Sequence, residues 1–224
     1  DVALNYGYET PESFTKAFKR FHGFNPSQVK KCKIKRFDPL TISIDIKGGE
    51  IKDMNYKVTD MFPLKLIGFV KEFDMETSYK EIPLFWDKIC EKYCYPHIYR
   101  GLPAENDYEQ AIIDNCIGEF GVCIECHGSK FKYLIAGKYT GGKVPEGMML
   151  YEFPAGKWAI FDCIGPCPEK LQELNTNIFK EWLPLNKDFE LRGDGNIEWY
   201  DCVNGEKTDP DYHTQIWLPI KNIK

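Results

Sequence analysis

The segments MFPLKLIGFV (residues 61–70) and EFPAGKWAIF (residues 152–161) resemble each other and decide the fold. Each reads as a β-strand. Each is followed by apolar residues at helical spacing, over 82–93 and 171–182, and then by two strand-like runs, 117–125 with 131–139 and 197–202 with 214–220. We therefore predict an α+β fold in which a β-α-β-β unit occurs twice. Such a duplication places a pseudo-twofold groove between its halves, and grooves of this kind are common ligand sites.

A further strand pair is expected before the first copy. Residues 40–46 alternate apolar and polar positions, Gly48 and Gly49 turn the chain, and residues 51–61 form the partner strand. A linker ends at about Pro39. We therefore divide the chain into an N-terminal segment, residues 1–36, and a domain, residues 37–224.

Charge is spread unevenly over these two parts. Residues 1–36 contain eight Lys and Arg but three Asp and Glu, a net charge of +5. Since the whole chain has a net charge of −5, residues 37–224 carry −10. A basic segment suits a polyanion such as DNA, whereas the acidic domain favours cations.

Composition excludes several classes of protein. Hydrophobic residues make up 43% of the chain, enough for a packed core. No apolar run approaches the length of about 18 residues that a transmembrane helix needs, so we expect no membrane partner. No secretory signal opens the sequence, and nine cysteines are an odd number, so we expect reduced thiols and a cytoplasmic location.

The sequence CIECH (residues 123–127) matches the pattern at which haem is attached in c-type cytochromes. Zinc binding by Cys123 and Cys126 is a second interpretation. The third is that both are ordinary strand cysteines, because the run around them is strand-like. We favour the third and therefore predict no cofactor and no metal.

The N-terminal segment has clear helix signals. Thr10 and Pro11 begin a helix and Gly23 ends it. A short segment ending at a glycine comes before this helix, and another short helix follows it, which is the outline of a helix-turn-helix. Three phenylalanines at i, i+4 and i+7 predict one buried stripe: Phe14, Phe18 and Phe21.

Residues 7–28, GYETPESFTKAFKRFHGFNPSQ, resemble the second helix-turn-helix of AraC-family transcription regulators. That family binds DNA through two such elements, so we expect the chain to be a fragment of a longer regulator. The first turns of a recognition helix face base edges in the major groove. The resemblance implies that DNA is contacted by Glu12, Ser13, Thr15 and Lys16, with Lys19 and Arg20 nearer the phosphates. The alternative is that these residues are only the solvated face of a helix.

Residues from about 40 to the C-terminus resemble the GyrI-like effector-binding domain. The motifs occur in the order of that family: FPAGKWAIF (153–161), EWLP (181–184), IEWY (197–200) and IWLPI (216–220). A GyrI-like domain joined to an AraC-type segment is a familiar arrangement. The two resemblances together imply a ligand-responsive transcription regulator that binds an amphipathic, cationic aromatic small molecule.

The same resemblance implies a site around Glu198, because ligand-sensing members carry a glutamate among aromatic residues in this strand. Glu198 and Tyr200 lie on one face of the strand. A carboxylate in an aromatic groove takes up a proton or attracts a cation, and aromatic rings attract cations too. The alternatives are an exposed edge position for Glu198 and core packing for the tryptophans. The candidate rings are Trp86, Trp158, Phe161, Trp199, Tyr200 and, from the first repeat, Tyr139.

Two other functions compete with regulation. Some GyrI-like proteins resemble hydrolases of strained electrophilic small molecules, and there Glu198 would activate water with help from Tyr200. Others associate only with a protein, DNA gyrase. The sequence contains no G-x-S-x-G, H-E-x-x-H or P-loop motif, and its four histidines share no spacing. We therefore expect a regulator and not an enzyme.

Overall fold

The computed structural model describes residues 2–31, 54–193, 195–202 and 204–223. The chain forms two compact units, Asp1–Gly49 and Glu50–Lys224, which are described separately. The strand predicted over residues 40–46 lies outside the described residues.

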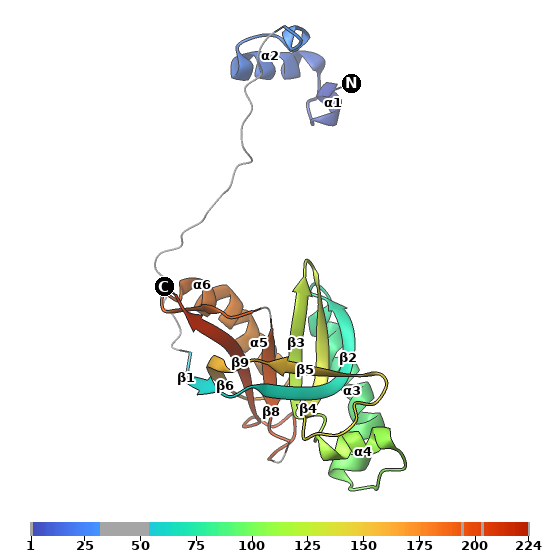
Figure 1. Ribbon diagram of the computed structural model, residues 1–224. Helices are drawn as coiled ribbons and strands as arrows, with labels where there is room; N and C mark the ends of the chain where they lie inside the picture. The colour runs from blue at the N-terminus through green and yellow to red at the C-terminus, as the bar shows by residue number, and fades with distance from the viewer. Residues whose placement is uncertain (1, 32–53, 194, 203, 224) are drawn as a thin grey trace. The chain divides into compact units, whose positions relative to one another are not determined.

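The first unit contains helix α1 (Val2–Asn5), helix α2 (Pro11–His22) and a 3-10 turn, η1 (Pro26–Gln28) (Figure 1). The Thr10 hydroxyl caps α2 by accepting a hydrogen bond from the Ser13 amide at 3.2 Å. Gly23 ends α2 with a φ of 85°, a left-handed conformation that glycine adopts without steric cost. Both predicted ends of this helix are therefore confirmed.

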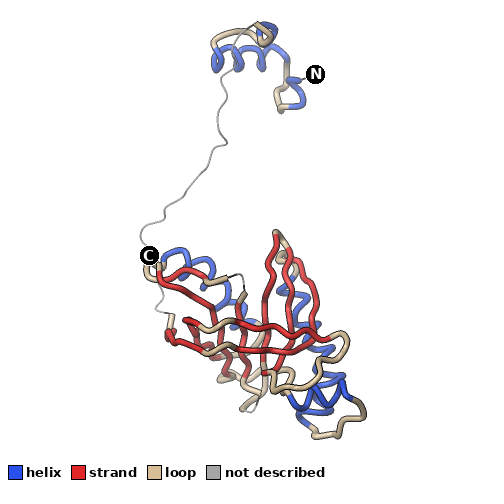
Figure 2. The backbone as a smooth tube through the Cα atoms, viewed as in Figure 1, coloured by secondary structure: helices blue, strands red, loops and turns tan. Residues whose placement is uncertain are grey.

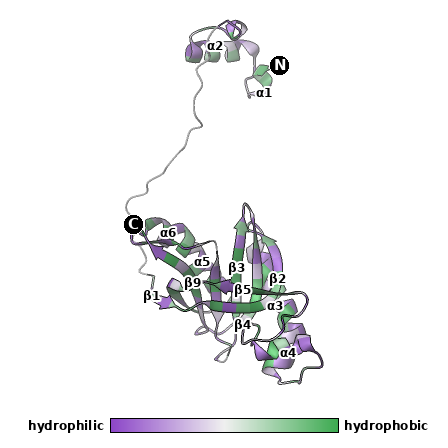
Figure 3. Ribbon diagram, in the orientation of Figure 1, coloured by the Kyte–Doolittle hydropathy of each residue, from purple (hydrophilic) through white to green (hydrophobic). Residues whose placement is uncertain are grey.

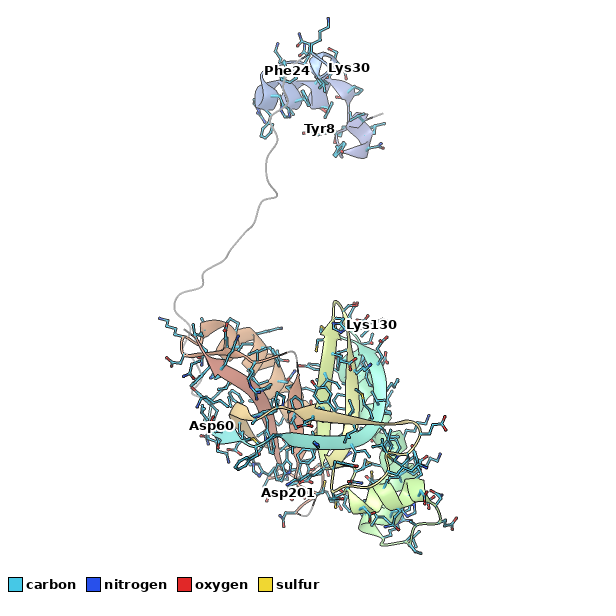
Figure 4. The ribbon with its side chains drawn as sticks, viewed as in Figure 1. Tyr8, Phe24, Lys30, Asp60, Lys130 and Asp201 are labelled. Carbon is cyan, nitrogen blue, oxygen red and sulfur yellow. The ribbon has the colours of Figure 1, made fainter. Side chains whose placement is uncertain are left out.

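The aromatic stripe of α2 is half-buried at Phe14 and Phe18 and departs most from the predicted buried stripe at Phe21. Phe14 and Phe18 pack with ring centroids 5.8 Å apart, and Phe18 packs on His22 at 4.4 Å. Phe21 is 58% exposed, so its predicted burial is wrong. The contacts advance in steps of four residues, and each step rotates the stripe by about 40° around the helix, which carries it to His22. Tyr8 and Phe24 extend the cluster at its two ends (Figure 4).

The second unit is built on one antiparallel sheet (Figures 1 and 2). Its strands follow the order β1-β6-β9-β8-β3-β4-β2-β5, and β7 pairs with β9. Their bounds are β1 (Tyr56–Met61), β2 (Leu64–Asp74), β3 (Phe120–His127), β4 (Lys130–Lys138), β5 (Met148–Phe153), β6 (Gly156–Ile164), β7 (Phe189–Leu191), β8 (Asn196–Tyr200) and β9 (His213–Asn222).

The strand order is symmetric about the central pair β3–β8. Exchanging β1 with β5, β2 with β6, β3 with β8 and β4 with β9 gives the same order read backwards. The outer strands are exchanged between the copies, because β1 pairs with β6 and β5 pairs with β2. The predicted duplication is confirmed, with one additional strand at the start of each copy.

Helices follow the second strand of each copy. The first copy has α3 (Ser78–Ile89), which continues as a π-helix, η2 (Cys90–Tyr99), and then α4 (Asp107–Asp114). The second copy has α5 (Glu169–Asn177), a π-helix, η3 (Ile178–Trp182), and α6 (Leu183–Leu185). Within the described part of the chain, none of the helices has the length and apolar character needed to span a membrane.

The sheet separates two hydrophobic clusters. One joins the sheet to the helices and includes Trp86, Leu171 and Tyr200. The other contains only strand residues on the opposite face, among them Trp158 and Ile197. From His213 to Leu218 of β9 the side chains alternate in burial, and green and purple residues occur along the same strand (Figure 3). Because both faces of the sheet carry apolar residues, the strands are held between two cores.

Candidate ligand-binding pocket

A pocket of about 680 Å³ lies between α3, α5 and the sheet. Both copies of the repeat contribute to its wall, as predicted for a groove between two halves. Its lining is mainly apolar and aromatic, and it also holds polar and charged side chains. The lining residues include Tyr79, Trp86, Asp87, Cys123, Cys126, Phe131, Cys167, Gln172, Asn175, Phe179, Leu191, Asn196, Glu198, Tyr200 and Lys207.

Tyr79 connects the two helices that border the pocket. The Asn175 side-chain amide donates a hydrogen bond to the Tyr79 hydroxyl at 2.9 Å, and the Gln172 side-chain amide donates to the Tyr79 carbonyl at 2.9 Å. These bonds join the start of α3 to α5. They fix the spacing between the helices and thereby the width of the pocket.

Glu198 is the centre of a hydrogen-bond network in the pocket wall. The Tyr133 hydroxyl donates to Glu198 Oε2 at 2.5 Å, and the Tyr200 hydroxyl donates to the same oxygen at 2.8 Å. The Trp86 indole N–H donates to the Tyr133 hydroxyl at 2.8 Å. The two tyrosine hydroxyls therefore favour negative charge on the Glu198 carboxylate, and the Trp86 N–H holds the Tyr133 hydroxyl in place.

Strand register explains how these side chains meet. Gly121 of β3 pairs with Glu198 of β8, and Tyr133 of the next strand, β4, pairs with Cys123 of β3. Tyr133 must therefore cross β3 to reach Glu198. A Cβ atom on residue 121 would overlap the Tyr133 hydroxyl and lie 2.6 Å from Glu198 Oε2. Glycine at this position leaves the space in which the Tyr133–Glu198 hydrogen bond forms.

Burial changes the acidity of this network. Burial raises the pKa of Glu198 above its ordinary value, although the hydrogen bonds from Tyr133 and Tyr200 lower it in part. Burial also raises the pKa of both tyrosines well above the ordinary value, so their hydroxyls remain donors. No lysine or arginine among the described residues forms an ion pair with Glu198. The Glu198 carboxylate thus accepts hydrogen bonds from two hydroxyl groups but has no cationic partner among the described residues.

Lys207 supplies a positive charge elsewhere in the pocket. Its ammonium nitrogen lies 5.6 Å from the centre of the Trp86 ring. This distance is within the range of a cation–π contact. The protein therefore already places one of its own cations against an aromatic wall of the pocket.

Three cysteines also line the pocket: Cys123, Cys126 and Cys167. Burial raises the pKa of Cys123 well above its ordinary value and that of Cys167 to about 12. Cys123 and Cys126 lie in β3, as the strand interpretation predicted. In residues 2–31, 54–193, 195–202 and 204–223, no cluster of three or more His, Cys, Asp or Glu side chains could hold a metal ion. The thiols form a soft, polarisable part of the wall.

The structure brings together three of the predicted ligand-binding residues: Trp86, Glu198 and Tyr200 all line the pocket. Trp199 does not, because it follows Glu198 directly and lies on the other face of β8, where its indole donates to Glu119 at 2.9 Å. Trp158 is fully buried in the same strand-only cluster, with its ring 5.2 Å from Phe153.

The remaining two predicted rings also lie outside the pocket wall. Phe161 is fully buried and stacks on Tyr56, with ring centroids 5.2 Å apart. The Tyr139 hydroxyl donates a hydrogen bond to the carbonyl of Gly142 in the loop after β4. We therefore correct the predicted site by leaving out Trp158, Phe161, Trp199 and Tyr139.

The predicted DNA contacts lie along α2. Glu12, Ser13, Lys16, Lys19 and Arg20 are exposed, as a binding face requires. Thr15 is half-buried, and its hydroxyl donates to the Pro11 carbonyl at 2.8 Å. Thr15 is therefore less available than the other five residues.

Comparisons with known proteins agree on the second unit. A family model described as Cass2, integron-associated effector binding protein, matches residues 61–220. The transcriptional regulator BrlR of Pseudomonas aeruginosa is 27% identical over 105 residues, which are 45% of this chain and 37% of BrlR. The chain thus matches well under half of that relative's length.

Two solved structures have the same fold. The structure of SAV2435 bound to tetraphenylphosphonium aligns with a TM-score of 0.58 and 20% identity, and covers 75% of this chain and 94% of that one. A putative transcription regulation protein from Staphylococcus aureus aligns with a TM-score of 0.52 and 21% identity, and covers 75% of this chain and 99% of that one.

Proposed function

Because the chain belongs to the family of integron-associated effector-binding proteins, we propose that its pocket binds hydrophobic aromatic cations as effectors. The observation that carries this proposal is Glu198, a carboxylate in an aromatic pocket that forms no ion pair with the described lysines and arginines. A buried charge without a partner is costly, and a bound cation supplies that partner.

Several properties of the pocket support this class of ligand. The rings of Trp86, Phe131, Phe179 and Tyr200 offer apolar area and faces that attract positive charge. The volume of about 680 Å³ lies in the range of small-molecule sites. SAV2435, which shares the fold, has been solved with the aromatic cation tetraphenylphosphonium.

A calorimetric titration of the protein with tetraphenylphosphonium tests the proposal. We expect saturable binding with one ligand per chain. A titration without binding would contradict the proposal. Turnover of strained electrophiles, measured in parallel, would support the alternative that Glu198 and Tyr200 act as a hydrolase.

The affinity for tetraphenylphosphonium is expected to fall as the pH is lowered. Burial raises the pKa of Glu198, so the carboxylate takes up a proton at a higher pH than an exposed glutamate does. Below that raised pKa, affinity should fall by up to about tenfold per pH unit, and above it affinity should be constant. Calorimetric titrations over a series of pH values check this. An affinity that stays constant over the pH range in which the protein remains folded would contradict it.

Lys207→Met is expected to tighten tetraphenylphosphonium binding by roughly threefold, because it removes a cation that already lies against Trp86. Methionine keeps an unbranched apolar side chain. The matched control is Lys130→Met, which removes the same charge from an exposed ion pair with Glu72 at the β3–β4 turn (Figure 4). Equal gains in both variants would indicate an effect of net charge and not of Lys207.

We further propose that the first unit binds DNA, which would make the chain part of a ligand-responsive transcription regulator. The support is the exposed basic edge of α2 and the resemblance of residues 7–28 to the AraC-family element. Residues 37–224, which carry a net charge of −10, are less suited to contact DNA.

Replacing Lys19 and Arg20 together by alanine should weaken DNA binding about tenfold and reduce its dependence on salt concentration, because phosphate contacts release counterions. The control removes two exposed lysines from α3, Lys80 and Lys88. Fluorescence anisotropy of labelled duplex DNA over a range of salt concentrations measures both effects. Equal losses in the two double variants would contradict a specific role for α2.

A further inference from the structure

A second polar side chain lines the pocket beside Glu198. Asn196 is the first residue of β8, and it is only 7% exposed. It precedes Glu198 by two residues, so the two side chains lie on the same face of the strand, about 7 Å apart along it. Both residues line the pocket.

Asn196 differs from the polar groups around it, because its side-chain nitrogen has no hydrogen-bond partner among the residues that the structure describes. Nδ2 is buried, and no described residue accepts a bond from it. By contrast, the polar groups of Trp86, Tyr133 and Tyr200 all donate hydrogen bonds within the network. Buried donors are nearly always paired in folded proteins, so an unpaired one needs an explanation.

The surroundings of Asn196 explain why no partner is at hand. In the sheet, Asn196 pairs with Cys123 of β3, and the lining of the same pocket includes Cys126 and Leu191. Thiols and alkyl groups are poor hydrogen-bond acceptors. An apolar side chain at position 196 would suit this wall better than an amide. The amide is therefore a specificity feature that the packing of the protein alone does not require.

We infer that Asn196 recognises a hydrogen-bond acceptor on the ligand, so that the preferred effector is an aromatic cation that also carries a carbonyl or ether oxygen. Glu198 pairs with the positive charge, and Asn196 donates to the oxygen. A site built to hydrogen-bond a polar group discriminates strongly against an analogue that lacks it, because the buried donor then stays unpaired. This inference rests on the proposed function and names the class of ligand more closely.

The test uses two permanent cations of nearly the same shape, (4-acetylphenyl)triphenylphosphonium and (4-isopropenylphenyl)triphenylphosphonium. A CH2 group in the second compound replaces the carbonyl oxygen of the first, and both substituents are planar, so the ratio of their affinities reports the effect of the acceptor. We expect the parent protein to bind the acetyl compound at least fivefold more tightly. In Asn196→Leu this preference should disappear, so that the ratio of the two affinities falls to about one.

Two further measurements keep the test decisive. The apo form of Asn196→Leu should unfold in urea at a midpoint no lower than that of the parent, because the substitution removes an unpaired buried donor at similar volume. If that variant does not fold, Asn196→Asp takes its place. Aspartate has nearly the same shape as asparagine, but a carboxylate oxygen stands where the NH2 donor was. The preference for the acetyl compound should disappear there too, although all cations should bind more tightly.

The outcomes separate the two proposals. If tetraphenylphosphonium binds and the acetyl compound has no advantage, or if the advantage persists in both Asn196 variants, the inference is wrong and the proposed function stands. If none of the three cations binds to the parent protein, the proposed function and the inference are both wrong.

Discussion

Glu198→Gln is expected to weaken tetraphenylphosphonium binding at least tenfold, a loss of about 1.4 kcal/mol. Glutamine keeps the shape of the side chain and a carbonyl oxygen that can accept the hydrogen bonds from Tyr133 and Tyr200. The substitution therefore removes the charge and leaves the network. Loss of one partner of a buried charge pair costs about 3–5 kcal/mol, and access of water to the pocket reduces this figure.

A matched control is Glu119→Gln. Glu119 also accepts a hydrogen bond from a ring, the Trp199 indole at 2.9 Å, but it does not line the pocket. This variant should bind tetraphenylphosphonium like the parent. A neutral compound, triphenylphosphine oxide, should lose less than about threefold in Glu198→Gln, because it has no net charge to pair. If Glu198→Gln binds the cation as tightly as the parent does, the Glu198 carboxylate is not part of the binding site.

Glu198→Gln should be at least as stable as the parent in the absence of ligand. The pKa of Glu198 is raised in the folded state, so its contribution to stability is fully present below the pKa in the unfolded chain and is lost as the pH rises through the folded-state pKa. Above the folded-state pKa the parent has lost this contribution, whereas glutamine has no charge to bury. Urea unfolding of the apo proteins at several pH values measures the difference.

The sequence predicted the fold well because the duplication is visible in local patterns. The helical spacing of apolar residues corresponds to helices α3 and α5, and the similar segments 61–70 and 152–161 contain most of strands β2 and β6. The exchange of outer strands, with β1 on β6 and β5 on β2, could not be predicted this way. It depends on pairing between segments about 100 residues apart, which no local periodicity encodes.

The site was predicted correctly at Trp86 of α3 and at Glu198 and Tyr200 of β8. Glu198 and Tyr200 lie two residues apart, so their common face follows from the period of a strand. Tyr133 reaches Glu198 from β4, 65 residues earlier in the chain, and no sequence pattern links them. Trp158 was misplaced because a strand buried on both faces has apolar residues at every position, and alternation then does not tell which face meets the pocket.

Gly121→Ala is expected to disrupt the pocket although it adds only a methyl group and changes no charge. The added Cβ would overlap the Tyr133 hydroxyl and lie 2.6 Å from Glu198 Oε2. Tyr133 is fully buried and cannot move freely, so the hydrogen bond between its hydroxyl and Glu198 should be lost. Overpacking of this kind costs about 1–3 kcal/mol of unfolding free energy. Tetraphenylphosphonium affinity should fall at least tenfold.

Combining Gly121→Ala with Tyr133→Phe distinguishes a local overlap from general damage to β3. Phenylalanine removes the hydroxyl that the new methyl group would meet, so the double variant should regain at least about 1 kcal/mol of unfolding free energy relative to Gly121→Ala alone. Ligand affinity should remain below that of the parent, because Glu198 then keeps only the hydrogen bond from Tyr200. Urea unfolding and calorimetry on the parent, both single variants and the double variant give the coupling. If the two substitutions are simply additive, the added methyl group does not act through Tyr133, and the space at Gly121 has another purpose.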